Sequence, residues 1–550
     1  MGAEERSRTQ GGYRPNSAGA SGLGAELTRR NFLKAGGGAL AGIYALQLAG
    51  CEPRVARRGP NTNILFLMAD QYRWDALGSV NPVVKTPHLD SLAARGVRFG
   101  RATVNAPMCL PSRYSMMTGL YPSQVGVRHN VQMCPTDENL PAPVLAQRLR
   151  EAGYQTAGFG KTHWYLGEDL APNVPVKTST RGFEVRAQRN TDEPRRVEPG
   201  AVQMGHERPE DYAALAAETG PYGSGETVAA YKGFTSSVPP ERHTEAWLTD
   251  KALEFLGGGR DEGRPFFLYL SFDYPHAPFN VPLGYEASYD LEEIPPPPEA
   301  PAGANLDGHA GREWKRWEQW LRETSAQERR MSTLRYYALC SYVDAQFGRV
   351  LRWLEETGEA ENTFVIFTSD HGEMLGERRR FSKYCLYEGS VRVPLILAGP
   401  GIPEGLRGTA DDRPAELVDV LPTLLSVAGE AAPPEFPGAS LLAEPARTGS
   451  YSEMHGTGYE KVQRAPAYMW RTRDWKLVTY LPGDAADAAS RAHEAKGELY
   501  DLRADPRELE NLYEDPGHLS VRERLRGELL MHLASVWARY PWQAARTPLA

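Results

Sequence analysis

The side chains best suited to chemistry in this chain stand just after apolar stretches. They are Asp70-Gln71, Lys161 to His163, Asp273 to His276 and Asp370-His371, together with Cys109 and its near neighbour Arg113. Carboxylates and imidazoles bind metals and move protons, lysine and arginine neutralise anions, and cysteine is a potential nucleophile. Residue types of this kind suit the transfer of an anionic group.

Alternating strands and helices are expected to position these side chains. Asn63 to Ala69 is a continuous apolar run bounded by polar residues, which predicts a strand buried on both faces of a parallel sheet. Similar strands are predicted at 155–160, 266–272, 364–369 and 393–398, with helices at 87–95, 142–152, 244–256, 334–354 and 415–427. This order predicts an α/β fold, in which chemistry lies at the carboxyl ends of the strands.

Other regions carry weaker patterns. Residues 185–243 and 284–330 have no sustained period and many charges, so we expect surface segments that border the substrate entrance. After about residue 445 the pattern changes to short antiparallel-looking strands and one helix. These elements are predicted at 467–472, 476–481, 497–502 and 521–538. The sequence therefore predicts a main α/β domain over 51–445 and a small α+β subdomain over 446–550.

The N-terminal region resembles an export signal. Arg29-Arg30 begins a twin-arginine pattern, and the apolar stretch that follows, 35–50, is shorter than the roughly 20 residues that span a bilayer. Leu48 to Cys51 resembles the lipobox of bacterial lipoproteins. We expect residues 1–50 to be a signal peptide, and Cys51 to carry a lipid anchor at the periplasmic or extracellular face of a bacterial membrane. A short core helix is the alternative.

Composition narrows the class of protein. Hydrophobic residues make up 41% and charged residues 24%, which is usual for folded soluble domains. The net charge of −8 does not favour nucleic acid as a partner. Five cysteines are too few for a disulfide framework. Cys340 lies in an apolar stretch and is expected in the core, whereas Cys134 and Cys385 either pair or stay free.

Several short blocks together resemble one family. Cys109 to Arg113, followed by Thr118-Gly119, resembles the sulfatases of the alkaline phosphatase superfamily, in which a separate maturation enzyme oxidises that cysteine to formylglycine. Further blocks resembling the family, in family order, lie at 86–92, 160–163, 275–278, 369–372 and 498–502. The resemblance covers about 62–515. It implies an alkaline-phosphatase-like fold with a large mixed, mostly parallel sheet between helices, followed by the C-terminal subdomain.

The resemblance also implies a metal site and a nucleophile. Asp70, Gln71, Asp370 and His371, together with position 109, match the family's ligands for one divalent cation. Oxygen ligands favour Ca²⁺, while the imidazole and the amide in place of a carboxylate leave Mn²⁺ or Mg²⁺ open. Cys109, as formylglycine, is expected to open a helix through Met117, whose free N–H groups would face the sulfuryl group.

The remaining site residues take their roles from the same resemblance. Arg113 is expected to hold the aldehyde hydrate, and Lys161 and Lys383 to neutralise the sulfuryl oxygens. His276, alone or with Lys383, is the expected proton donor to the leaving alcohol, and His163 the base that breaks down the sulfated intermediate. Alternatively, Lys383 and the nearby residues 378–380 form a basic lining of the entrance. In the family a leucine usually follows the histidine that corresponds to His163. Here Trp164-Tyr165 follow it instead, so the sequence leaves the size of the substrate open.

These residues favour hydrolysis of a sulfate monoester, on a sulfated carbohydrate or a small alkyl sulfate, through a covalent sulfo-formylglycine intermediate. The spelling of the later blocks is closer to choline and iduronate sulfatases than to aryl sulfatases. A phosphonate monoester or phosphodiester hydrolase with the same nucleophile is the first alternative, and a non-catalytic lipoprotein that binds sulfated glycans is the second. Expected partners are the maturation enzyme, the twin-arginine export machinery and a membrane surface.

Overall fold

A computed structural model describes most of the chain after residue 61. The described residues are 62–130, 135, 139–163, 181–188, 203–204, 214, 217–218, 227–296, 320–444, 447–456, 466–480 and 497–539. The predicted signal peptide, Cys51, Cys134 and Trp164-Tyr165 lie outside these ranges, so the expectations for them stay predictions. Among the described helices, none has both the length and the apolar composition needed to cross a bilayer.

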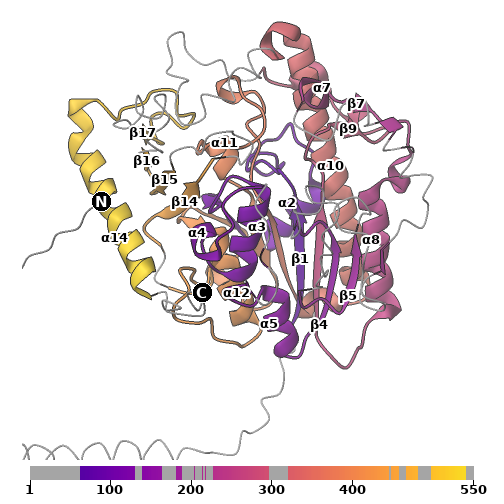
Figure 1. The fold of residues 1–550 in the computed structure, drawn as a ribbon. Coiled ribbons are helices and arrows are strands. Elements are labelled where there is room, and N and C mark those ends of the chain that lie inside the picture. Colours follow the sequence, from indigo (N-terminus) through magenta and orange to yellow (C-terminus); the bar gives the residue numbers. More distant parts are fainter. Residues whose placement is uncertain are drawn as a thin grey trace, which may run out of the picture. The chain divides into compact units, whose positions relative to one another are not determined.

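A nine-stranded sheet forms the centre of the fold (Figure 1). Its order is β12 (Thr409–Asp411), β2 (Val97–Phe99), β11 (Leu395–Ala398), β10 (Thr363–Ser369), β1 (Asn63–Ala69), β8 (Phe266–Phe272), β4 (Gln155–Gly160), β5 (Val185–Gln188) and β6 (Gln203–Met204). The neighbouring strands β10, β1, β8 and β4 are all parallel, as predicted, whereas β11 runs antiparallel to both β10 and β2. The sheet is therefore mixed and mostly parallel.

Helices cover both faces of this sheet, which explains why its strands read as continuous apolar runs. Leu65 and Leu67 of β1 pack on one face with α2 (Pro87–Arg95), α8 (Thr244–Glu254) and α10 (Ala326–Glu356). Ile64 and Phe66 point to the other face, where α3 (Cys109–Thr118), α5 (Leu145–Glu151) and α12 (Val420–Val427) lie. Alternate residues of each strand thus enter two separate cores.

Some predicted boundaries were wrong. Residues 185–188 and 203–204 are strands of the large sheet rather than surface segments, and that region also holds α7 (Val228–Lys232) and β7 (Phe234–Thr235). Helix α10 begins at Ala326, ahead of the predicted start, because Ser325 and Glu328 form a capping box there. Ala415–Glu416 is β13, paired with β3 (Ala102–Thr103), and β7 pairs with β9 (Asn280–Val281).

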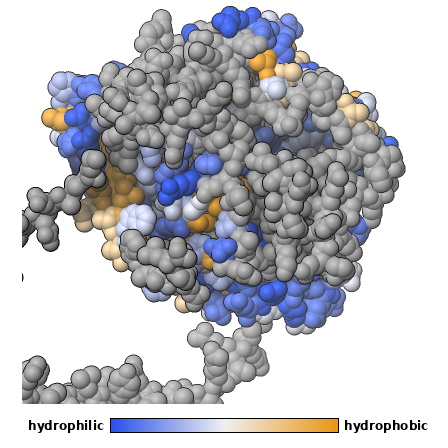
Figure 2. Space-filling view, viewed as in Figure 1, coloured by the Kyte–Doolittle hydropathy of each residue, from blue (hydrophilic) through white to orange (hydrophobic). Residues whose placement is uncertain are grey.

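The predicted C-terminal α+β elements are present. An antiparallel sheet orders β14 (Ser450–Met454), β15 (Ala467–Arg471), β16 (Trp475–Tyr480) and β17 (Glu498–Asp501). Helix α14 (Leu519–Arg539) contacts β15 and β16. Its outer side exposes Leu530, Met531 and Trp537, and Figure 2 shows hydrophobic surface gathered over this helix at the left of the view. The boundary at residue 445 stays a prediction.

Candidate active site

Two neighbouring strands bring the two key aspartates together. Strands β1 and β10 are parallel, and Ala69 lies opposite Ser369 in their register. Asp70 and Asp370 follow these residues directly, so both carboxyl groups emerge at the same edge of the sheet. The chain then turns sharply after Asp70, because Gln71 has a positive φ of 65°.

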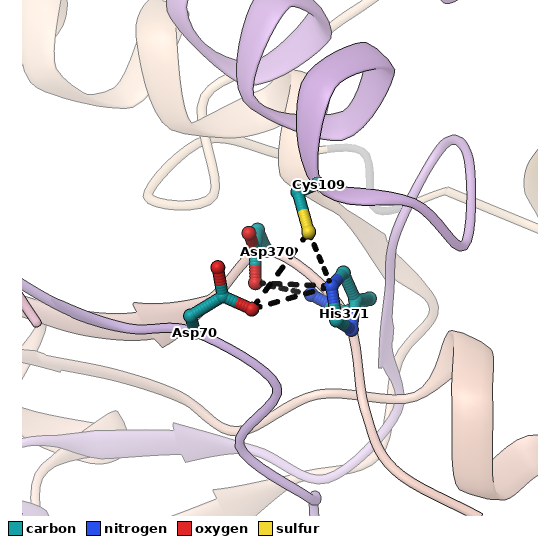
Figure 3. A group of neighbouring side chains, drawn as sticks. All are labelled: Asp70, Cys109, Asp370 and His371. Carbon is teal, nitrogen blue, oxygen red and sulfur yellow. Dashed lines mark hydrogen bonds and ion pairs between the residues drawn. The ribbon is translucent and has the colours of Figure 1, made fainter. Parts of the chain in front are cut away.

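Helix α3 brings Cys109 to this edge from above the sheet (Figure 3). The helix begins at Cys109, as predicted, and extends one residue beyond the predicted end to Thr118. Cys109 Sγ lies 3.0 Å from His371 Nε2 and 3.8 Å from Asp70 Oδ1. One potential ligand atom from each of Asp70, Cys109, Asp370 and His371 lies within 4.8 Å of the others, and all four residues are buried.

In each aspartate one carboxyl oxygen faces this cluster, and the other contacts a positively charged side chain. Asp370 Oδ2 accepts from Arg113 Nε at 2.7 Å, and Asp70 Oδ2 lies 2.8 Å from Lys161 Nζ. The Oδ1 atoms lie toward His371, at 3.4 Å from its Nε2 for Asp70 and 3.7 Å for Asp370. Arg113 and Lys161 therefore hold the carboxylates in an orientation that turns one oxygen of each toward a shared centre.

The protonation states suit a metal centre. Burial alone would raise the pKa of Asp70, but the charges of Lys161 and Arg113 help to hold it well below its usual range. Burial lowers the pKa of His371 and favours its neutral form. His371 Nδ1 lies 2.9 Å from the Gly372 carbonyl, which can only accept, so Nδ1 carries the proton and Nε2 presents a lone pair to the cluster.

The donor set fits a hard or borderline divalent cation. Two carboxylate oxygens and one imidazole nitrogen converge on the thiol of Cys109, whose sulfur marks the place of the oxygens that a formylglycine hydrate would carry. Calcium, manganese and magnesium all accept carboxylate oxygens, and manganese also suits an imidazole. The residues present therefore fit one such ion, and its identity stays open.

Gln71, also predicted as a ligand, lies in a polar network beside this cluster. Its Oε1 accepts from Lys383 Nζ at 3.0 Å, and its Nε2 donates to Glu373 Oε2 at 2.5 Å and to Tyr231 Oη at 3.3 Å. Its main-chain N–H donates to Asp370 Oδ1 at 3.2 Å. The structure thus places Gln71 between the aspartate cluster and Lys383, and the ligand role stays a prediction.

Lys383 lies within the site rather than in a basic lining of the entrance. It is only 5% exposed, and its Nζ lies 2.7 Å from His276 Nε2. His276 Nδ1 lies 2.7 Å from the Ala277 carbonyl and so carries its proton, which leaves Nε2 to accept from Lys383. Arg378, by contrast, is buried against the ring of Tyr387 and donates to the Glu508 carbonyl. The basic residues of this loop therefore serve different purposes.

His163 follows β4 in a left-handed conformation, with φ of 57°. Burial and the charges of Lys161 and Arg113 hold its pKa well below the usual range, so this imidazole is neutral at pH 7. A neutral imidazole can accept a proton, which suits the base predicted at this position.

The expectation that free N–H groups at the start of α3 face the sulfuryl group was wrong in part. The first turn of α3 offers few free N–H groups, because Leu110 N donates to Asn130 Oδ1 at 3.1 Å and Ser112 N donates to the Met108 carbonyl at 3.1 Å. Pro111 has no N–H group at all. Charge on a bound anion must therefore be neutralised mainly by side chains.

Sequence reasoning missed several supporting residues. Tyr269 and Ser271 accept from Arg113 Nη1 at 3.2 and 3.1 Å. Asp273, which the sequence did place at a strand end, lies with its Oδ1 3.2 Å from Lys161 Nζ. Tyr269 and Ser271 are two positions apart within the apolar run of β8, so they lie on the same face of the strand. Two polar side chains on one face of a buried strand could have indicated a polar partner. Glu373 follows Asp370-His371 by two positions, but nothing in the sequence pattern indicates its contact with Gln71.

Comparison with known proteins decides the family. The family model described as sulfatase matches residues 62–430, more than half of the chain, and a model described as N-sulphoglucosamine sulphohydrolase, C-terminal, matches residues 376–534. The chain belongs to the sulfatase family. This sulfatase is therefore a sulfuric ester hydrolase, and its family uses a metal ion and formylglycine.

Individual relatives cover most of this sulfatase. It is 30% identical to a choline-sulfatase of Rhizobium meliloti, over 82% of this chain and 83% of the relative. It is 28% identical to an arylsulfatase of Clostridium perfringens, over 86% and 94%. A phosphonate monoester hydrolase from Silicibacter pomeroyi superposes with a TM-score of 0.67 at 25% identity, over 86% and 95%. These matches confirm the predicted alkaline-phosphatase-like fold.

Proposed function

We propose that this sulfatase hydrolyses a sulfate monoester of a carbohydrate or a small alcohol, with position 109 as formylglycine beside one bound divalent cation. The observation that carries the proposal is the convergence of Asp70, Asp370 and His371 on the side chain of Cys109. Relatives named choline-sulfatase and arylsulfatase support a sulfate ester as the substrate.

Formylglycine and the metal ion would supply distinct chemistry. A formylglycine hydrate at position 109 would supply two hydroxyl groups on one carbon, one for attack on sulfur and one whose deprotonation releases sulfate. A cation held by Asp70, Asp370 and His371, with Gln71 beside it, supplies charge that polarises the ester.

Charged side chains of this chain would bind and orient the substrate. Lys161 is tied to Asp70 and Asp273, whose charges raise its pKa against the opposing effect of burial, so it stays cationic. Lys161 and Lys383 would neutralise the sulfuryl oxygens. Arg113, fixed by Asp370 and by the Lys161 carbonyl at 2.7 Å, would orient the groups at position 109.

Proton transfer would fall to two separate groups. Because His276 Nε2 accepts from Lys383 Nζ, the proton of this pair resides on Lys383, and the pair would donate it to the departing alcohol oxygen. His163, neutral and at the end of β4, would take a proton from position 109 in the second half-reaction.

Phosphonate monoester or phosphodiester hydrolysis is the second candidate. It is favoured by the superposition on a phosphonate monoester hydrolase at 25% identity. Assaying 4-nitrophenyl sulfate, choline sulfate, a panel of sulfated sugars and phenyl phosphonate esters in parallel separates the two. We expect the highest kcat/KM on a sulfate ester. Dominant turnover of the phosphonate ester would overturn our first choice.

Maturation and export are proposals of their own. Mass spectrometry of the tryptic peptide ending at Arg113, after expression with a formylglycine-generating enzyme, should show an aldehyde or its hydrate at position 109. An unmodified thiol would favour the glycan-binding lipoprotein instead. We also propose twin-arginine export and a lipid on Cys51 that holds the enzyme at a bacterial membrane. Replacing Arg29 and Arg30 by lysine should block export, and unchanged export would contradict this route.

A further inference from the structure

A closed ring of hydrogen bonds joins the metal side of the site to the loop that carries Lys383. Glu373 Oε2 accepts from Gln71 Nε2 at 2.5 Å, and Gln71 Oε1 accepts from Lys383 Nζ at 3.0 Å. Glu373 Oε1 accepts from the main-chain N–H groups of Ser382, at 2.6 Å, and Leu375, at 2.8 Å. Ser382 is the residue before Lys383, so the peptide bond between these two residues closes the ring from Glu373 through Gln71 back to Glu373.

The chemistry of the ring fixes the direction of the Gln71 amide. Lys383 Nζ has only donors to offer, and the Glu373 carboxyl oxygens are acceptors to all three N–H partners. The amide oxygen must therefore face Lys383 and the amide nitrogen must face Glu373, because the flipped amide would lose both bonds. Glu373 and Gln71 are fully buried, so water cannot replace a lost bond cheaply.

The ring also explains an amide at position 71. A carboxyl group there would set its oxygen against Glu373 Oε2, where the amide now donates at 2.5 Å. Two acceptors would then face each other without a hydrogen. Only a side chain with one donor and one acceptor serves both Glu373 and Lys383.

We propose that Glu373 is a positioning residue, which holds Gln71 Oε1 on the side of Lys383 Nζ, in the orientation that the predicted ligand role uses, and sets the place of Lys383 in the same network. This inference rests on the proposed metal-dependent function, and it predicts that Glu373 controls metal affinity without touching the ion. It acts by holding the amide in one orientation and by joining Leu375 to Ser382 across a loop in which Leu375, Arg378 and Ser382 have positive φ.

The test exchanges the two side chains. Glu373→Gln leaves an N–H group facing either Gln71 or the main-chain donors, so Mn²⁺ affinity should fall about 10- to 100-fold, as for other residues that orient metal ligands. Gln71→Glu should also bind Mn²⁺ more weakly, because its carboxyl oxygen would face Glu373 Oε2 with no hydrogen between them. In the double variant Q71E/E373Q the hydrogen bond between positions 71 and 373 returns with its direction reversed, while the donors Lys383, Ser382 and Leu375 keep theirs. Affinity should therefore recover above that of either single variant.

Calorimetric titration of the metal-free full chain with MnCl₂ measures this affinity without any turnover. Unchanged affinity in Glu373→Gln, or a double variant that is no better than the weaker single variant, would overturn the proposal. If Glu373→Gln does not fold, Gln71→Glu and the double variant still decide, and a double variant that does not fold counts against the pairing.

Glu377→Gln is the matched control. Glu377 lies in the same loop and pairs with Arg73 instead of Gln71, so its variant should keep the Mn²⁺ affinity. Sulfate ester assays on the same proteins keep the two proposals apart. Failure of the proposed function would show as absent turnover with metal binding intact, whereas failure of the positioning role would show in the metal titration alone.

Discussion

At Cys109 the surroundings work against an ordinary thiol nucleophile. Burial, together with the negative charge of Asp70, raises the pKa of Cys109 to about 12, so the thiol stays protonated at neutral pH. Thiolates rather than thiols attack substrates, so reactive cysteines usually lie where their pKa is lowered. The site thus favours conversion of this residue over direct use of its sulfur.

Replacing Cys109 by alanine should abolish turnover and keep the fold. The variant lacks any group that can be converted to an aldehyde, so kcat should fall about 10⁴-fold or more, as when other nucleophiles are removed. Initial rates with an aryl sulfate measure the loss, and circular dichroism checks the fold. Cys340→Ala, which removes a buried thiol in the core of α10, is the control and should stay active. Turnover by Cys109→Ala would remove this residue from the mechanism.

Lys383→Met should impair substrates unequally. Loss of the proton held between Lys383 and His276 should cost about 10²- to 10⁴-fold in kcat for an alkyl sulfate, since its alcohol needs a proton to leave. A nitrophenyl sulfate, whose leaving group is stable as an anion, should suffer less. Comparing kcat for the two esters checks this. Arg379→Met changes an exposed cation of the same loop and should leave both rates near those of the wild type.

At the scale of elements, a buried carboxyl group fixes the start of a helix. Asp344 of α10 accepts from the main-chain N–H groups of His88, at 3.2 Å, and Leu89, at 2.7 Å, in the first turn of α2. Thr86, before that helix, makes no side-chain cap of its own. Asp344 therefore supplies from another helix the cap that the local sequence lacks.

Asp344 should make stability depend on pH. Burial raises its pKa from 3.8 to about 7, so between about pH 4 and 7 the folded protein binds a proton that the unfolded chain has released. Its contribution to stability is full below pH 4 and is lost as the pH rises to 7, by about 2–4 kcal/mol at about 1.4 kcal/mol per pKa unit. Urea unfolding at several pH values should show that the free energy of unfolding falls less steeply between about pH 4 and 7 for Asp344→Asn than for the wild type. Asp250→Asn, at a side chain that is about half exposed, is the control for removing a carboxylate.

At the scale of the whole molecule, a buried charge cluster joins the C-terminal sheet to the catalytic part. Glu388 of α11 (Glu388–Val391) accepts from Arg471 of β15 through both carboxyl oxygens, each at 2.8 Å. Lys476 Nζ of β16 lies 2.8 Å from Glu388 and 2.6 Å from Glu508. Glu508 also accepts through its carbonyl from Arg378, in the loop that carries Lys383. Through Glu388 and Glu508, the C-terminal sheet is thus connected to the loop that carries Lys383.

Lys476→Met should destabilise the protein by about 3–5 kcal/mol, because removing one partner leaves two buried carboxyl groups without their shared cation. Urea unfolding followed by fluorescence measures the loss. Arg524→Met removes an exposed ion pair with Glu528 and should cost no more than about 1 kcal/mol. Equal stability of the two variants would show that the cluster contributes little to holding the C-terminal sheet.

The sequence by itself determined the strands that lead directly to Asp70 and Asp370, the helix that begins at Cys109, and the family, because each depends on local runs of residues. It also placed Lys161 and His276 at the strand ends, where an α/β sheet carries chemistry.

Only the tertiary structure decided which of these ends meet and what supports them. Strands β1 and β10 are neighbours although about three hundred positions separate Asp70 from Asp370, and Gln71 and Glu373, 302 positions apart, form one hydrogen bond. It also moved Lys383 from a possible surface cluster into contact with His276. Such contacts depend on how the crossovers order the strands and on buried polar groups finding partners, and no local pattern encodes either.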